Sequence, residues 1–301
     1  MMTPYMLIIL AVFCFAGQFA FTNLYERAVK QTMTTSLVML VVTSAFGALL
    51  YLSIGRFQMQ ISAISIFWAV TFALVMIPYY MIGIKVLSLG SLAIYSMFMM
   101  LGGMLVPFFY GVLFLEEEIS IGKIIGTVLL TFFIVWQAIT QTSSDEKRVV
   151  GKTKYLFFIL CLCIFFVNGM TGVIAKAHSI SEGAVDEASF TVIYCAITAM
   201  LGCVCALFAC VKKDNRISVR LSLNLKAILV MIFLGMAAYG GNFFLLLAAD
   251  KVPASVQFPL VSGGVILLSA SVSVFLFKEK ISKVEWISVL GAFASTFLFA
   301  F

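Results

Sequence analysis

The sequence predicts an all-helical, polytopic membrane protein with about ten transmembrane helices. Two observations predict this class: 63% of the residues are hydrophobic and only 11% are charged, and the charges are confined to short clusters between long apolar stretches. A spanning helix needs roughly 20 apolar residues, and a soluble globule of this composition would leave apolar helix faces in water. A transmembrane β-barrel would show shorter segments of alternating polarity.

Ten stretches that are uncharged or nearly so are the candidate spans. They cover residues 1–25, 31–55, 57–84, 86–115, 124–144, 155–175, 188–211, 227–249, 252–277 and 286–301. The last is the shortest, and Lys283 and Glu285 just before it can keep their polar ends at headgroup level. The first has no cationic segment before it and is longer than the apolar core of a signal peptide, so we expect it to be retained as a helix.

The positive charges predict an orientation. The loops after the odd-numbered helices hold 15 of the 19 lysines and arginines. By the positive-inside rule these loops face the cytoplasm, which places both chain ends outside. The net charge of +6 therefore concerns orientation and lipid headgroups rather than nucleic acid.

The cysteines predict neither disulfides nor a metal site. All seven fall within apolar stretches, where free thiols pack as small apolar groups. Histidine, the usual companion ligand, is absent from their neighbourhood. We therefore expect no metal and no cofactor.

The chain contains a candidate internal repeat. Its most polar connection, residues 141–154, separates a first half (1–140) from a second half (155–301), with five predicted helices in each. A shift of 162 residues aligns Gly102 with Gly264 and Glu117 with Glu279. Glycine pairs at these positions allow close helix contact. Because each half has an odd number of helices, the two copies would be inserted in opposite directions, as in many secondary transporters.

On these features the chain resembles the EamA-like ten-helix branch of the drug/metabolite transporter superfamily, in which a Glu closes the fourth helix of each half. The resemblance implies two EamA-like repeats, a central cavity between them, and alternating-access transport of small metabolites. The family's Trp-Gly-x-Asn motif is replaced by Phe15-Ala16-Gly17-Gln18. The resemblance also implies chain ends in the cytoplasm, opposite to the charge distribution, and leaves the direction of transport open.

Helix interruptions predict where a cavity would lie. The 162-residue shift places Pro78 opposite Gly240, with Gly241 beside it. Proline frees a backbone carbonyl, and glycines weaken a helix or admit a close neighbour. We expect hinges at these residues, with a simple packing kink as the alternative.

Polar side chains within the apolar stretches are the candidate substrate-binding residues. An unpartnered amide in hydrocarbon costs about 2–7 kcal/mol, so each must bond to a neighbouring helix, to water or to substrate. A shift of 150 aligns Gln18 with Asn168. The full candidate set is Gln18, Tyr80, Tyr95, Asn168, Tyr239, Asn242 and Gln257.

Charged residues at helix ends have two readings. Glu117 and Glu279 oppose the helix macrodipole where they stand, so we expect each to cap the next helix across the turn, with gating between the halves as the alternative. Lys85 and Lys176 can extend to the interface or approach the mouth of a cavity.

The sequence therefore predicts a secondary-active or facilitative transporter of a small neutral or zwitterionic metabolite in a cell membrane, expected to be a bacterial plasma membrane. Acidic residues are missing from the middle of every span, so proton coupling through such a group has no candidate. The alternatives are a non-transporting receptor or assembly subunit, or a lipid-modifying enzyme. With one histidine in the chain and Glu116–Glu118 as its acidic cluster, a catalytic set is not evident, and we predict no enzyme. The expected partners are the metabolite and the bilayer.

Overall fold

The structure is a computed structural model that describes residues 3–29, 32–89, 92–142, 152–210, 219, 223–249, 251–276, 278 and 282–300. Within these residues the regular structure is entirely helical. The helices are α1 (Pro4–Ala28), α2 (Met33–Ile54), α3 (Ala63–Leu89), α4 (Leu92–Phe114), α5 (Ile121–Thr142), α6 (Lys152–Ser179), α7 (Glu187–Ala209), α9 (Leu225–Ala249), α10 (Ala254–Phe275), α11 (Lys283–Ser295) and the 3₁₀ helix η1 (Thr296–Ala300).

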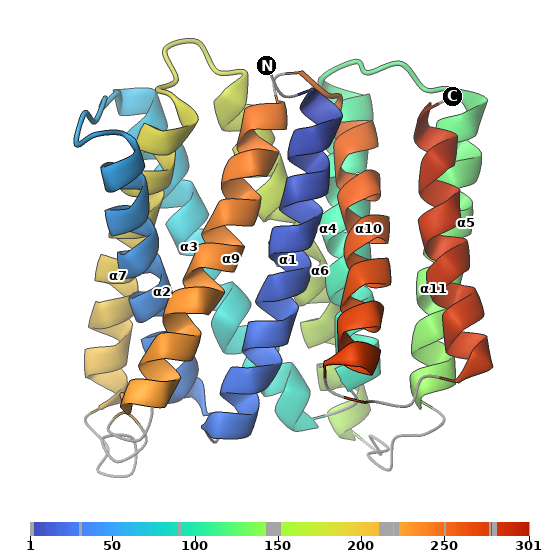
Figure 1. The fold of residues 1–301 in the computed structure, drawn as a ribbon, viewed down its shortest axis with the longest axis horizontal. Helices are drawn as coiled ribbons and strands as arrows, with labels where there is room; N and C mark the ends of the chain where they lie inside the picture. Colours follow the sequence, from blue (N-terminus) through green and yellow to red (C-terminus); the bar gives the residue numbers. More distant parts are fainter. Residues whose placement is uncertain are drawn as a thin grey trace.

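Successive helices run in opposite directions across one bundle (Figure 1). Both chain ends lie on the same face of the bundle, which we call the terminal face, together with the turn from α9 to α10. The helix pair α2 and α7 lies at one end of the bundle and the pair α5 and α11 at the other (Figure 1). Between them, α1 packs on α9 and α10, and α4 packs on α6 and α10.

Seven of the described helices are long and apolar enough to cross a membrane. Their apolar segments are Pro4–Thr22, Thr34–Ile54, Ala63–Gly83, Tyr155–Ser179, Glu187–Ala209, Leu225–Ala249 and Ala254–Val272. The described apolar segments of α4 and α5 are shorter. Large apolar side chains point outward, for example Ile121 (77% exposed) and Phe208 (76% exposed). An outer surface of this kind fits a protein surrounded by lipid.

Glycine allows two close crossings between helices of the two halves. A Cβ atom at Gly102 of α4 would lie 2.0 Å from the carbonyl oxygen of Phe165 in α6. A Cβ at Gly264 of α10 would lie 2.9 Å from the side chain of Val12 in α1. These are the close helix contacts that the glycine pairs predict, because only a residue without a side chain lets the backbones approach so far.

The residues expected to act as hinges lie inside continuous helices. Helix α3 continues through Pro78, and α9 continues through Gly240 and Gly241. At Gly241 a Cβ would lie 2.9 Å from the ring of Phe15, so this glycine serves the approach of α1 to α9. Of the two roles that the sequence allows for these glycines, the close approach of a neighbouring helix is therefore observed at Gly241.

Several features recur at one spacing along the chain. Helices α3 and α9, α4 and α10, and α5 and α11 begin 162 residues apart. The same spacing separates Glu116 and Lys278, whose φ angles of 53° and 57° lie in the left-handed region. Ser120 and Ser282, also 162 apart, each accept a hydrogen bond at 3.2 Å from the backbone N–H three residues later, at the starts of α5 and α11.

We predict that Gly102→Ala destabilises the fold, because the added methyl group collides with backbone that cannot rotate away. Overpacking of this kind costs about 1–3 kcal/mol, so the Tm of the detergent-purified protein should fall by roughly 5 °C. Gly17→Ala is the matched control, since its Cβ would meet Ala237 at an ordinary 3.7 Å. Equal Tm values for the two variants would contradict the close crossing.

Candidate functional site

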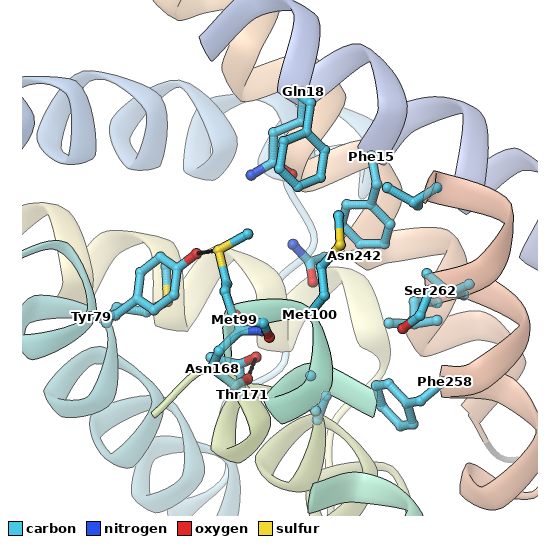
Figure 2. A pocket seen from close by; sticks show the side chains of 18 of the residues that line it. Phe15, Gln18, Tyr79, Met99, Met100, Asn168, Thr171, Asn242, Phe258 and Ser262 are labelled. Atoms are coloured by element: carbon cyan, nitrogen blue, oxygen red, sulfur yellow. Dashed lines mark hydrogen bonds between the residues drawn. The ribbon is translucent and has the colours of Figure 1, made fainter. Parts of the chain in front are cut away.

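A cavity of about 230 Å³ lies between helices of both halves. One liquid water occupies about 30 Å³, so the cavity has room for a small molecule. Figure 2 shows its labelled lining side chains arranged around an open centre. The lining comes from α1, α3, α4, α6, α9 and α10. It comprises Phe15, Gln18, Phe19, Phe72, Met76, Tyr79, Tyr80, Met99, Met100, Gly103, Asn168, Thr171, Gly172, Ala175, Asn242, Leu245, Phe258, Val261, Ser262 and Val265.

The lining is aromatic and sulfur-rich, with polar groups that carry no charge. Six of its residues are phenylalanine or tyrosine and three are methionine. Its polar side chains are three carboxamides and the hydroxyls of serine, threonine and tyrosine. Among the described residues that border it, none is acidic, basic or histidine. A few polar groups in an apolar wall are typical of a small-molecule site.

Asn168 is fixed by helix α4. Its Nδ2 donates to the carbonyl oxygen of Met99 at 2.7 Å, and Tyr79 donates its hydroxyl to the Met99 sulfur at 3.1 Å (Figure 2). A carbonyl can only accept, so the amide nitrogen must face Met99. The Asn168 Oδ1 is left without a protein partner among the described residues, as an acceptor at the cavity wall.

Asn242 presents a similar arrangement from α9. Its Nδ2 donates to the carbonyl oxygen of Ala238, one turn earlier in the same helix, at 2.9 Å. The bond fixes the nitrogen against the helix, and within the described part of the chain Oδ1 accepts no hydrogen bond. Asn242 thus supplies a second oriented amide oxygen.

Gln18 differs from both asparagines. Its backbone carbonyl accepts a bond from Thr22, but no described residue bonds to its carboxamide. Figure 2 shows the amide end of Gln18 directed toward the interior of the cavity. The described structure likewise holds no hydrogen bond to the side-chain hydroxyls of Tyr80 and Ser262. Gln18 therefore offers a donor and an acceptor side by side.

Two other candidates, Tyr239 and Gln257, do not line this cavity. Tyr239 is buried against Ser44, with 2.6 Å between the two hydroxyl oxygens, and its backbone carbonyl accepts from Tyr51. Gln257 is fully buried and donates to the Leu245 carbonyl. The Tyr95 side chain lies outside the part of the structure that can be described.

Glu117 caps a helix, but not the one that we expected. Its two carboxylate oxygens accept from the N–H groups of Ala254 and Ser255, at 2.8 and 2.9 Å, at the start of α10. The cap at the start of α5 is Ser120 instead. A carboxylate at a helix N-terminus satisfies unpaired donors and the macrodipole together. The cap joins the first half to the second. Glu279 lies outside the described residues.

Lys176 does not extend to the interface as we expected. The side chain is buried, and Nζ donates to the carbonyl oxygens of Ala249 and Val252, the second at 3.4 Å. Those carbonyls lie at the end of α9 and in the following turn, where helix carbonyls lack intrahelical partners. Lys85 is exposed. The α9–α10 turn is thus bonded by Lys176 and, at the start of α10, by Glu117.

Groups that could do acid–base chemistry lie away from the cavity. His178 Nε2 and Ser65 Oγ are 3.0 Å apart, but the two residues are 1% and 0% exposed, and neither lines the cavity. The His178 ring stacks on Phe190 with 3.6 Å between centroids. Within the described residues, no group of three His, Cys, Asp or Glu side chains is placed to hold a metal.

Sequence reasoning missed three polar residues of the wall: Tyr79, Thr171 and Ser262. Ser262 occupies the position 162 residues after Met100, and Thr171 follows Asn168 by one helical turn. Thr171 donates to the Asn168 carbonyl at 2.6 Å. Applying the 162-residue shift to every wall position would have found Ser262. Nothing in the sequence distinguishes Thr171 from other threonines and serines, because small hydroxyl residues are common in apolar helices.

Comparison with known proteins identifies the fold of the chain, but neither a family nor a function. No protein-family model and no curated protein sequence matches the chain. One crystal structure of another protein is similar over 98% of this chain and 95% of that chain, with a TM-score of 0.71 and 13% sequence identity. At that identity the likeness concerns the fold alone.

We predict that Glu117→Gln weakens the cap on α10, because an amide has one acceptor oxygen and no charge. Losing a cap costs about 1 kcal/mol or more, so backbone amide hydrogen exchange at Ala254 and Ser255 should become about 5- to 30-fold faster. Glu118→Gln at the exposed neighbouring residue is the control. Unchanged exchange in Glu117→Gln would mean that the carboxylate does not hold the helix start.

Proposed function

We propose that this protein is a secondary-active or facilitative membrane transporter that moves a small neutral or zwitterionic metabolite by alternating access, as its resemblance to EamA-like transporters implies. The observation that supports this is the cavity, whose described lining carries no charge and comes from both halves of the chain. Its wall holds the carboxamide of Gln18 and the Oδ1 atoms of Asn168 and Asn242, which have no partner among the described residues. In an apolar bundle such groups are retained at a cost, and binding of a substrate explains their retention.

The 162-residue spacing supports the proposal that the halves are inverted repeats. The wall positions Tyr80 and Asn242, and Met100 and Ser262, are related by it. Helices so related run in opposite directions across the bundle (Figure 1). A cavity at the junction of such repeats is where transporters of this architecture bind substrate.

The packing supports a different register for the first helix of each repeat from the one that we expected. Gly102 meets Phe165 in α6, and its repeat partner Gly264 meets Val12 in α1. Phe165 and Val12 are 153 residues apart, whereas the sequence comparison used 150. In this register Gln18 corresponds to Thr171, one turn beyond Asn168, and both members of the pair line the cavity.

The ten spans belong to the same proposal. Figure 1 draws α4, α5 and the α11–η1 segment along the full depth of the bundle beside the seven longer apolar helices. A tenth crossing through α11 and η1 accounts for both chain ends on the terminal face. The proposed location is a bacterial plasma membrane.

The test is solute flux into proteoliposomes that contain the purified protein. We predict that Asn242→Leu, which keeps the size of the side chain and removes its amide, lowers the flux at least about tenfold, as expected when a buried hydrogen bond to substrate is lost. Gln58→Leu, at an exposed residue outside the cavity, should leave the flux unchanged. A folded wild-type protein that moves no solute from a broad metabolite set would overturn the proposal.

A further inference from the structure

We propose that the cavity recognises a neutral, planar nitrogen heterocycle whose edge carries an N–H beside a C=O, as in the pyrimidinediones and related lactams. This inference rests on the proposed function only in taking the cavity as the substrate site. Three properties of the wall carry it: the absence of charge in its described residues, the free carboxamide of Gln18, and aromatic rings on opposite sides.

The uncharged wall selects against ionic substrates. A carboxylate or ammonium group that leaves water needs an opposite charge or several hydrogen bonds to compensate. The described wall has neither Lys or Arg for an anion nor Asp or Glu for a cation. Lys176 directly follows the wall position Ala175 in sequence. Its Nζ donates instead to backbone carbonyls at the end of α9 and in the turn that follows. The preferred substrate is therefore uncharged.

Gln18 supplies a matched pair of hydrogen-bonding atoms. Its Nε2 and Oε1 belong to one rigid plane, and no described residue bonds to either. A carboxamide pairs in a bidentate manner with any flat group that has a donor next to an acceptor, which is how Asn and Gln side chains read a base edge in nucleic acids. A lactam edge has this arrangement: its N–H donates to Oε1 and its C=O accepts from Nε2.

Asn168 and Asn242 add acceptors to the wall. Each has its nitrogen tied to a backbone carbonyl, so each presents Oδ1 to the cavity. A second N–H of the ligand would satisfy one of these oxygens. A ligand with several ring N–H groups therefore fits the wall better than one with only acceptors.

The rings favour a flat body. Figure 2 shows Tyr79 on one side of the open centre and Phe15 and Phe258 on another. Aromatic faces and the thioethers of Met99 and Met100 gain most from contact with a planar, polarisable ring. A sugar or an aliphatic chain would leave much of this surface poorly packed.

The test compares three small probes by isothermal titration calorimetry with the full chain in lipid nanodiscs. Uracil has the proposed edge, 1,3-dimethyluracil has the same ring without an N–H, and orotate adds a carboxylate to the uracil ring. We predict that wild-type protein binds uracil at least about tenfold more tightly than either analogue. Gln18→Met should bring uracil and 1,3-dimethyluracil within about twofold of each other, whereas the exposed control Gln58→Met should keep the wild-type preference.

Each outcome decides the matter. Equal affinity of wild type for uracil and 1,3-dimethyluracil, tight binding of orotate, a preference that survives Gln18→Met, or no binding of uracil would overturn the heterocycle assignment. These measurements need no transport, so they are separate from the flux assay. Flux of another metabolite without the uracil preference would leave the proposed function standing and remove this inference. A preference for uracil without any flux would leave this inference standing and remove the proposed function.

Discussion

The rest of the structure depends on one constraint: a polar group inside an apolar helix bundle must find a partner within the protein, because lipid offers none. Asn168 meets this demand through the Met99 carbonyl, Lys176 through carbonyls at the end of α9, and Gln257 through the Leu245 carbonyl. In each of the three cases a side chain bonds to a backbone atom of another helix. The carboxamide of Gln18 and the two asparagine Oδ1 atoms, which have no partner among the described residues, line the cavity. Other buried atoms without a partner, such as Oε1 of Gln257, lie outside it.

The same constraint accounts for the hydrogen bonds made to the end of α9 and to the start of α10. Glu117 occupies the N–H groups at the start of α10, and Lys176 occupies carbonyls at the end of α9 and in the turn. Both sets of backbone groups would otherwise be unsatisfied at a helix end. Because Glu117 belongs to the first half and α10 to the second, any motion that separates the halves at the terminal face has to break a pair of charge-assisted bonds. The carboxylate was read from sequence as a cap or a gate, and its position between the halves allows both descriptions.

Part of the candidate site was accessible from sequence. Gln18, Tyr80, Asn168 and Asn242 were selected because amides and phenols are costly in the middle of an apolar helix, and all four line the cavity. The same reasoning selected Tyr239 and Gln257, whose polar atoms bond to protein elsewhere. The local sequence does not distinguish these cases, since the cost of burial is the same whether the partner is a neighbouring helix or a ligand.

The sequence by itself determined the class of protein. Long uncharged stretches can be solvated only by lipid or by each other, so helices of spanning length follow from hydropathy alone. The tertiary structure alone decided which helices meet, and through them that Glu117 caps α10, that Lys176 is buried, and that Gln18 rather than Gln257 keeps a free amide. The physical reason is that hydropathy is a local property of the chain, whereas a hydrogen-bond partner is set by contacts between residues up to 195 positions apart.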